Sequence, residues 1–142
     1  MSELILKKFT QEDVLLCLTL LQQKNPKVAM EIFKNGRTSL LYLPDSLNPD
    51  KIDWLKRKRN SVMYFGMSTK ALNEKQQGNE SVLVSKYALD PAQFTIEMGA
   101  VPIKVEGVGL IGCLALTGLA AMEDHRLAME LLEEINRRHD GA

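Results

Sequence analysis

Apolar positions dominate the stretch 14–21, where Thr19 alone interrupts a run of Val, Leu and Cys. Ahead of this run, Thr10 stands three residues before Asp13, which is the spacing of a helix N-cap followed by an acidic first turn. Asn25-Pro26 stops the pattern, because the residue before a proline is disfavoured in the helical region. We therefore expect a helix over about 10–25. Since the helix is apolar on most sides, it is expected to be covered on most sides.

Two further apolar runs, 28–33 and 38–43, flank the dipeptide Asn35-Gly36. Asn-Gly supplies the two positive-φ residues of a type I′ turn, so the two runs predict a β-hairpin. The second run is almost continuously apolar, which predicts a strand buried on both faces. Pro44 ends this strand.

The next helix is predicted over Pro49–Phe65, with Asn48 as its cap and Pro49 at the first helical position. Two of its sides carry large apolar groups when successive residues are placed about 100° apart. One side holds Ile52, Leu55, Val62 and Met63 around Arg59, and the other holds Trp54, Ser61, Tyr64 and Phe65 beside Arg57. We expect the first side to pack on the sheet and the second on a partner subunit. Gly66 is expected to bend the helix, which continues over 67–76.

The C-terminal third predicts a second strand pair, over 100–105 and 108–116 with a turn at Glu106-Gly107, and a closing helix over about 120–138. Strand pairs joined by tight turns do not form a parallel doubly wound sheet. The order therefore predicts the α+β class, with an antiparallel sheet of about five strands flanked by helices in α/β/α layers. A chain of 142 residues with 45% hydrophobic residues is expected to form a single domain over residues 1–142.

Charge and composition give no indication that the chain binds nucleic acid or a membrane. The 18 basic and 18 acidic residues give a formal net charge of zero, so nothing global attracts the chain to nucleic acid or to a membrane surface. Cys17 and Cys113 both lie in apolar runs and are expected to be small buried hydrophobes in a reducing compartment. The start of the sequence is too short and too charged for a signal peptide, and no apolar run reaches membrane-spanning length. These features predict a cytoplasmic protein.

A glycine motif and a charge run are candidates for chemical sites. The segment 107–112 matches G-x-G-x-x-G, but a dinucleotide site requires a helix directly afterwards, and here strand-like residues 113–117 follow. The glycines are therefore expected to mark a bulge or a close backbone approach. The run 56–59 points in four directions around its helix, with Asp53 spaced to pair with Lys56 and Arg57, so it is interpreted as a solvated face. Arg59 is expected to pair with a carboxylate, the alternatives being an anionic ligand or a subunit interface.

His125 is the histidine with an interpretable context, because it falls near the start of the closing helix. A helix N-terminus disfavours the charged imidazole and leaves the neutral form, which ligates metal or haem iron. The alternative is a histidine satisfied by backbone or by a partner subunit. His139 falls in the expected frayed tail, and the two cysteines lack metal-ligand spacing, so no other metal site is predicted.

Several motifs occur in the order and spacing of a known family. They are Asp53-Trp54-x-x-Arg57-Lys58-Arg59-Asn60, Phe65-Gly66-x-Ser68, Gly99-Ala100-Val101-Pro102-Ile103, Gly107-x-Gly109, and Thr117-Gly118-Leu119 with Asp124-His125. The chain resembles the GlcG/HbpS-like, haem-degrading-domain proteins, in their uncharacterised bacterial and fungal branch. The resemblance implies a profilin-like antiparallel sheet flanked by helices, assembly into homo-oligomers, and handling of haem or ferric iron. Fungal relatives are instead linked to tail-anchored-protein targeting, as assembly partners rather than enzymes.

Two hypotheses for function follow. The first is a site for haem or a similar small anionic ligand, formed where Trp54, Arg57, Arg59, Ser68, Gly99, Pro102, Asp124 and His125 meet. In it, Arg57 or Arg59 pairs with a propionate and His125 faces the iron. The second is an oligomeric interaction or assembly protein without a cofactor, anchored by Trp54, Tyr64 and Phe65. Whether the chain is an enzyme is left open by the sequence.

Overall fold

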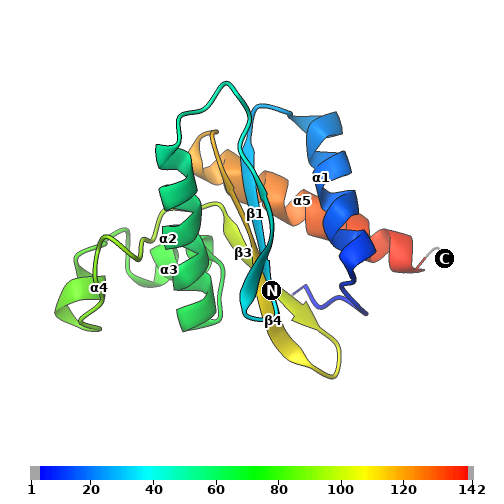
Figure 1. The fold of residues 1–142 in the computed structure, drawn as a ribbon. Coiled ribbons are helices and arrows are strands. Elements are labelled where there is room, and N and C mark those ends of the chain that lie inside the picture. The colour runs from blue at the N-terminus through cyan, green and yellow to red at the C-terminus, as the bar shows by residue number, and fades with distance from the viewer. Residues whose placement is uncertain (1–3, 141–142) are drawn as a thin grey trace.

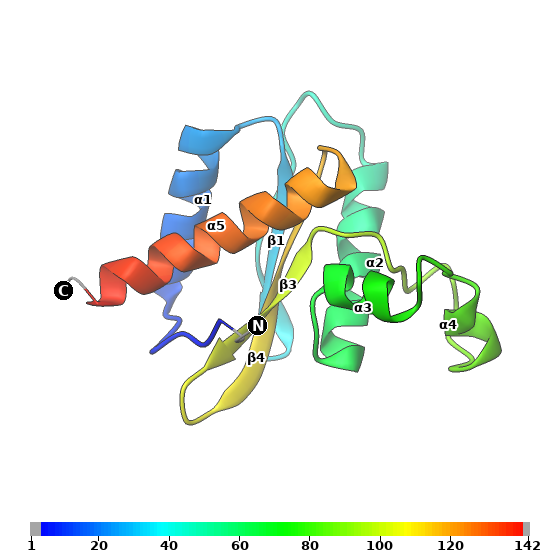
Figure 2. The same ribbon diagram turned by 180° about the vertical axis from the view of Figure 1, so that it is seen from behind.

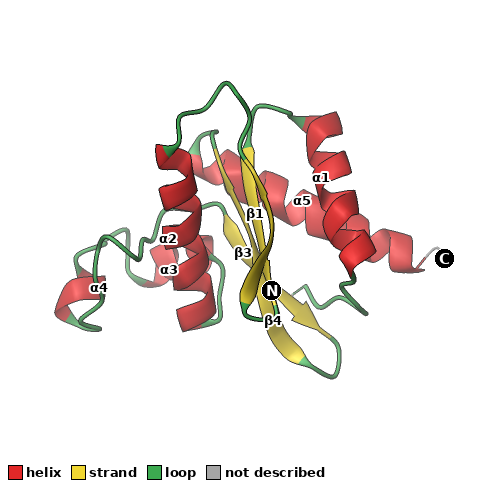
Figure 3. Cartoon of the chain, in the orientation of Figure 1, coloured by secondary structure: helices red, strands yellow, loops and turns green. Residues whose placement is uncertain are grey.

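The computed structural model describes residues 4–140, in which two pairs of consecutive strands are separated and flanked by helices in an α+β arrangement (Figure 3). The elements are α1 (Gln11–Lys24), β1 (Ala29–Lys34), β2 (Arg37–Tyr42), α2 (Asp50–Phe65), α3 (Thr69–Lys75), α4 (Val82–Ser85), β3 (Ala100–Val105), β4 (Gly109–Thr117) and α5 (Ala121–Asp140). The predicted class, an antiparallel sheet flanked by helices, is confirmed.

The sheet has four strands in the order β2-β1-β4-β3, all antiparallel to their neighbours. The prediction of about five strands is therefore one too many. In place of a fifth strand within residues 4–140, Leu6 alone forms an isolated parallel bridge with Val105 at the outer edge of β3. At the other end of this edge, the Thr69 hydroxyl accepts a hydrogen bond from the Ala100 N–H and donates one to the Ala100 carbonyl. The edge of β3 is thus covered by single residues rather than by a strand.

Helices cover the sheet on both faces (Figures 1 and 2). One face packs against α1 and α5, through Met30, Ile32, Leu114 and Leu116 among others. The other face packs against α2 through small side chains, Ala29, Ala100, Cys113 and Ala115, which meet Leu55 and Val62. Because these sheet residues are small, α2 lies close enough for its polar side chains to reach the sheet backbone.

The β1–β2 hairpin forms as predicted, with Asn35 at φ 53° and Gly36 at φ 81°. The prediction that its second strand is buried on both faces is wrong. β2 is an edge strand, and Leu41 is 47% exposed while Leu40 and Tyr42 pack toward the core. The apolar residues of β2 are therefore divided between a face that packs on the core and a face that no other part of residues 4–140 covers.

The first helix begins with the predicted cap. The Thr10 hydroxyl accepts a hydrogen bond from the Asp13 N–H, and the Asp13 carboxylate accepts one from the Thr10 N–H at 2.8 Å. The helix is covered on most sides as expected, because the apolar residues of 14–21 other than Leu15 are buried or pack partly buried against the core, and Leu15 is 56% exposed. The C-terminal tail is also more ordered than expected: α5 runs to Asp140, and Nε2 of His139 lies 3.1 Å from both carboxylate oxygens of Asp13.

Two expectations for the second helix need correction. The Asn48 side chain does not cap the helix. Pro49 occupies the N-cap position instead, and α2 begins at Asp50. Gly66, at φ 70°, ends the helix rather than bending it, and Ser68 then caps a separate helix, α3. The outer side of α2 was expected to meet a partner subunit. Within the chain this side is covered in part: the Phe65 ring packs edge-on against Tyr87 at 5.0 Å, while Tyr64 is 57% exposed.

Candidate functional sites at the start of the last helix

A cavity of about 240 Å³ lies between α3, β3 and the first half of α5. Its apolar wall consists of Leu4, Met67, Ala71, Pro102 and Met129. Its polar groups come from Ser68, Lys70, Glu74, Lys104 and His125. We call this space the His125 cavity. It combines an apolar surface with a few convergent polar groups, the usual composition of a small-molecule site.

His125 lines this cavity and has one ring nitrogen without a partner in the described part of the chain. Its Nδ1 atom is buried and has no hydrogen-bond partner among the described residues 4–140. Burial lowers the pKa of the imidazole, and the positive charge of Lys70 lowers it further, while Glu74 opposes the shift. The sequence argument for a neutral imidazole is thus supported, with burial as the largest cause of the lowered pKa. A neutral imidazole with a free nitrogen is a good ligand for a metal ion.

The other polar groups of the His125 cavity are engaged to different degrees. Ser68 uses its hydroxyl oxygen to accept the Ala71 N–H at 3.0 Å, so it caps α3. Lys70 forms an ion pair with Glu74 at 3.1 Å, one helical turn away, where both groups are in reach of solvent. Lys70 therefore remains able to exchange this carboxylate for that of a ligand, because exposed ion pairs contribute little free energy.

A second cavity, of about 220 Å³, lies on the other side of the start of α5. Trp54, Met98, Leu119 and Ala121 form its walls, and Lys51, Lys58, Glu97, Thr117 and Asp124 supply polar atoms. We call this space the Lys58 cavity. It lies beside α2, whereas the His125 cavity lies beside α3.

Lys58 and Asp124 form an ion pair between these walls, with side chains only 4% and 2% exposed and an N–O distance of 3.6 Å. The Lys58 ammonium also donates to the Leu116 carbonyl at 2.8 Å, and the Asp124 carboxylate accepts the Leu119 N–H at 3.1 Å. Gly99 makes room for the pair. A Cβ at Gly99 would lie 2.8 Å from the Lys58 nitrogen and 2.6 Å from the Leu116 oxygen.

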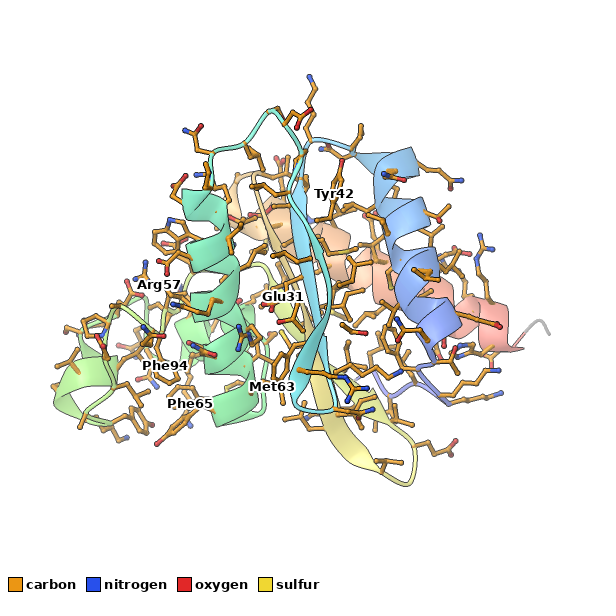
Figure 4. The ribbon with its side chains drawn as sticks, viewed as in Figure 1. Glu31, Tyr42, Arg57, Met63, Phe65 and Phe94 are labelled. Carbon is orange, nitrogen blue, oxygen red and sulfur yellow. The ribbon has the colours of Figure 1, made fainter. Side chains whose placement is uncertain are left out.

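The two arginines proposed as ligand partners occupy different surroundings. Arg59 bonds Glu31 at 3.2 Å, which confirms that it pairs with a carboxylate, and it lies over the Phe33 ring. Arg57 stacks on Trp54, with its guanidinium carbon 4.1 Å from the ring centre. Its Nε atom is buried and has no partner among residues 4–140. Figure 4 shows Glu31 on the sheet side of α2 and Arg57 on the side away from the sheet.

The eight residues predicted from sequence therefore do not meet at one junction. Ser68, Pro102 and His125 line the His125 cavity, whereas Trp54 and Asp124 line the Lys58 cavity. Gly99 lies against the Lys58–Asp124 pair, and the two arginines face neither cavity. Lys58 was missed, because the charge run containing it was interpreted as a solvated face. Its spacing from Leu55 and Val62 was the available signal, since these positions share one side of a helix.

The arrangement defines a class of protein: a small α+β chain with an antiparallel sheet between helical layers and two small cavities, of about 240 and 220 Å³, where its last helix begins. The chain belongs to the family described as "Haem degrading protein HbpS-like", whose model matches residues 11–133. The resemblance drawn from the sequence motifs is confirmed by this match.

Two of the similar sequences belong to proteins named UPF0303. A UPF0303 protein of Serratia proteamaculans (strain 568) is 35% identical over 105 residues, which are 74% of this chain and 65% of that protein. A UPF0303 protein of Paraburkholderia xenovorans (strain LB400) is 35% identical over 104 residues, which are 73% of this chain and 63% of that protein. The chain thus spans slightly less than two thirds of the length of these relatives.

Solved structures share the fold. The crystal structure of the Ybr137w protein has a TM-score of 0.78 at 25% identity, over 90% of this chain and 80% of that chain. HbpS gives 0.68 at 15% identity, over 95% and 92% of the two chains. A PduOC:Heme complex gives 0.70 at 16% identity, over 93% and 96%. Identities of 15% and 16% establish the fold alone. None of the helices within residues 4–140 is both long and apolar enough to cross a membrane.

Proposed function

We propose that the chain binds haem, or a similar flat, largely apolar ligand that carries carboxylates, in the His125 cavity. The observation that supports this most strongly is the buried Nδ1 of His125, which has no partner within the described part of the chain. A buried polar atom without a partner costs free energy, and a bound ligand would remove that cost. The family match and the PduOC:Heme neighbour support the same class of ligand.

The residues around His125 fit such a ligand in chemistry and, in part, in size. Met67, Pro102 and Met129 offer an apolar surface, and Lys70 at the rim offers a cation for a carboxylate. A volume of about 240 Å³ is just below the range of roughly 300–1,000 Å³ in which small-molecule sites enclose their ligands. We therefore infer that the cavity holds one edge of the ligand and leaves the rest outside. Haem, when bound, supplies the redox chemistry of its iron, while His125 supplies a neutral nitrogen ligand and the methionines exclude water.

A haemin titration followed by absorbance tests the proposal. The wild-type chain is expected to give a saturable shift of the Soret band at stoichiometric haemin. His125→Ala is expected to weaken binding by about 100-fold or more, since even loss of an outer-shell partner weakens metal sites by about 10–100-fold. His139→Gln is the matched control, because His139 pairs with Asp13 away from the cavity. Equal titrations for wild type and His125→Ala would contradict the proposal.

The same titration has an expected pH dependence. Only the neutral imidazole can ligate iron, and burial holds the pKa of His125 below its ordinary value of about 6.5. Binding should therefore persist at pH 6.5 and weaken only at more acidic pH, as the imidazole takes up a proton. The measurement is the dissociation constant across the acid range. A midpoint at or above about 6.5 would be inconsistent with the half-buried His125 as the ligand.

Self-association is a second function that we propose, and the open edge of the sheet favours it. β2 has no strand beyond it within residues 4–140, and Leu41 on that strand is 47% exposed. Unpaired strand edges with apolar side chains are natural pairing surfaces. Leu41→Lys is expected to lower the mass measured by light scattering. Val108→Lys, in the turn between β3 and β4 at a residue that is 71% exposed, is the control. An unchanged mass for Leu41→Lys would contradict the use of this edge.

A further inference from the structure

The outer side of α2, away from the sheet, is covered along its second half and open along its first. Asn60 and Tyr64 both contact the segment 93–95, through an amide hydrogen bond of 2.9 Å and an edge-on ring contact of 5.8 Å. Toward the start of the helix, Asp50 and Asp53 are exposed. The open half therefore covers about two helical turns, and it is a polar surface rather than an apolar one.

Arg57 lies at the centre of this open half. Its guanidinium stacks on the Trp54 ring, with the central carbon 4.1 Å from the ring centre, and this contact fixes its position. Within residues 4–140 it makes no hydrogen bond and no ion pair. The Nε atom is buried, whereas the two terminal nitrogens keep contact with solvent. Arg57 thus presents a fixed cation whose outward donors are free for a carboxylate from elsewhere.

The carboxylates of the same stripe are only weakly engaged. Positions 50, 53 and 57 are spaced by three and four residues, so their side chains follow one line along the helix. Asp53 pairs with Lys56 at 3.3 Å, and Asp50 pairs with Lys51 at 3.5 Å. Both pairs are exposed, so exchanging either partner costs little free energy. The stripe therefore carries two available acids at its start and one unpaired cation beyond them.

Such a stripe complements a second copy of itself in one orientation. In a parallel pair, Arg57 would lie opposite the same cation of the other copy. In an antiparallel pair with a two-fold axis at position 54, position 57 lies level with position 51 of the other copy, between its two acids. At a rise of about 1.5 Å per residue, both acids are then within about 3 Å of that level along the helix, which an arginine side chain can reach.

We propose that the outer side of α2 binds a second copy of the chain by antiparallel helix pairing. Arg57 of each copy pairs with the partner's Asp50 and the partner's Asp53, and the two Trp54 rings lie near the two-fold axis. The contact is made twice, as two-fold symmetry requires. Tryptophan and arginine are also the side chains that most often supply the binding energy of an interface. The formal net charge of zero adds no overall repulsion between copies.

This surface is separate from those already proposed. Arg57 lies on the side of α2 that faces away from the sheet, as Figure 4 shows, whereas the open edge of the sheet is formed by β2. The inference rests neither on ligand binding in the His125 cavity nor on pairing through Leu41. A chain that uses both surfaces would assemble beyond a dimer, and blocking one surface would leave the other contact intact.

Charge reversal followed by mixing tests the proposal. Arg57→Glu places like charges opposite each other, and so does the double variant Asp50→Lys with Asp53→Lys. Each variant alone is expected to raise the dissociation constant for self-association by about 30-fold or more, the effect of losing an interface hot spot. The measurement is the mass by light scattering over a dilution series. Lys8→Glu, at an exposed lysine ahead of α1, is the control and should associate as the wild type does.

An equimolar mixture of the two reversed variants is expected to regain the wild-type mass, because every opposed pair is then attractive again. Circular dichroism checks that each variant is folded, and Asp53→Lys alone replaces the double variant if that one is not. An unchanged mass for Arg57→Glu would overturn the proposal and leave Arg57 as a solvated side chain. A mixture that stays dissociated would overturn it too, as would a wild-type chain that is monomeric throughout.

Discussion

Gly112→Ala is expected to prevent stable folding. Gly112 lies in β4, opposite Lys34 of β1 and Ile103 of β3, so backbone surrounds it on both sides. A Cβ built on Gly112 would overlap the Phe33 carbonyl oxygen and lie 2.9 Å from the Phe33 carbonyl carbon. Because β1 and β4 are the two central strands, relieving this overlap would separate the middle of the sheet. We expect a loss of about 4 kcal/mol or more in the free energy of unfolding, measured by urea denaturation.

Gly107→Ala is the matched control in the adjacent turn. Its Cβ would meet no atom within 4 Å among the described residues, although its φ of +76° strains any side chain. The expected loss is only about 1–2 kcal/mol, the cost of a left-handed conformation. If both variants lost similar stability, the close approach of β1 and β4 at Gly112 would not be the reason for the glycine.

Lys58→Met is expected to destabilise the chain by about 3–5 kcal/mol, the usual loss when one member of a buried ion pair is removed. The substitution keeps the length of the side chain but leaves Asp124 without its cation. It also leaves the Leu116 carbonyl without the donor that lies 2.8 Å away. The free energy of unfolding in urea measures the loss.

Lys56→Met, two residues earlier on the same helix, is the control. Lys56 pairs with Asp53 at 3.3 Å, but the two side chains are 37% and 52% exposed, so the pair should contribute less than about 1 kcal/mol. Adding Asp124→Asn to Lys58→Met should recover part of the loss, because the unpaired charge is then gone. Equal costs for Lys58→Met and Lys56→Met would show that burial of the pair adds nothing.

Local signals in the sequence predicted the local structure well. Asn35-Gly36 forced the hairpin turn, and Thr10 with Asp13 capped the first helix, because the interacting groups are within three residues of each other. The close backbone approach expected of the glycines in the segment 107–112 is found at Gly112 in β4, whereas Gly107 lies in the turn before that strand with no neighbouring atom where its Cβ would be. Such predictions depend on backbone geometry that a few neighbouring residues determine.

Tertiary packing decided the features that the sequence did not predict. The sequence pattern places Arg59 at the centre of the buried side of α2. In the structure the centre lies nearer to Lys58, because Ile52 is 39% exposed and Arg59 lies at the edge of that side, where it pairs with Glu31. A single helix pattern gives the centre of a face only to within about one residue. Which cation is buried depends on the partner carboxylate, and Asp124 comes from another helix 66 positions away.

The residues predicted to form one site are divided between two cavities for a simpler reason. Asp124 and His125 are neighbours in sequence, and neighbours on a helix point about 100° apart. The start of α5 therefore directs one residue into each cavity. His139 shows a similar limit, since only the crossing of α1 and α5 reveals that the tail reaches Asp13. The family motifs identified the right segment without giving this geometry.

The location of iron in crystals of the chain grown with haemin tests the central claim most directly. Anomalous scattering at the iron edge gives the position of the metal without reference to any substitution. We predict a single strong signal beside the imidazole of His125, with the macrocycle against Met67 and Met129. Signal at the Trp54–Arg57 side of α2, or haemin on the surface without contact to His125, would contradict the account.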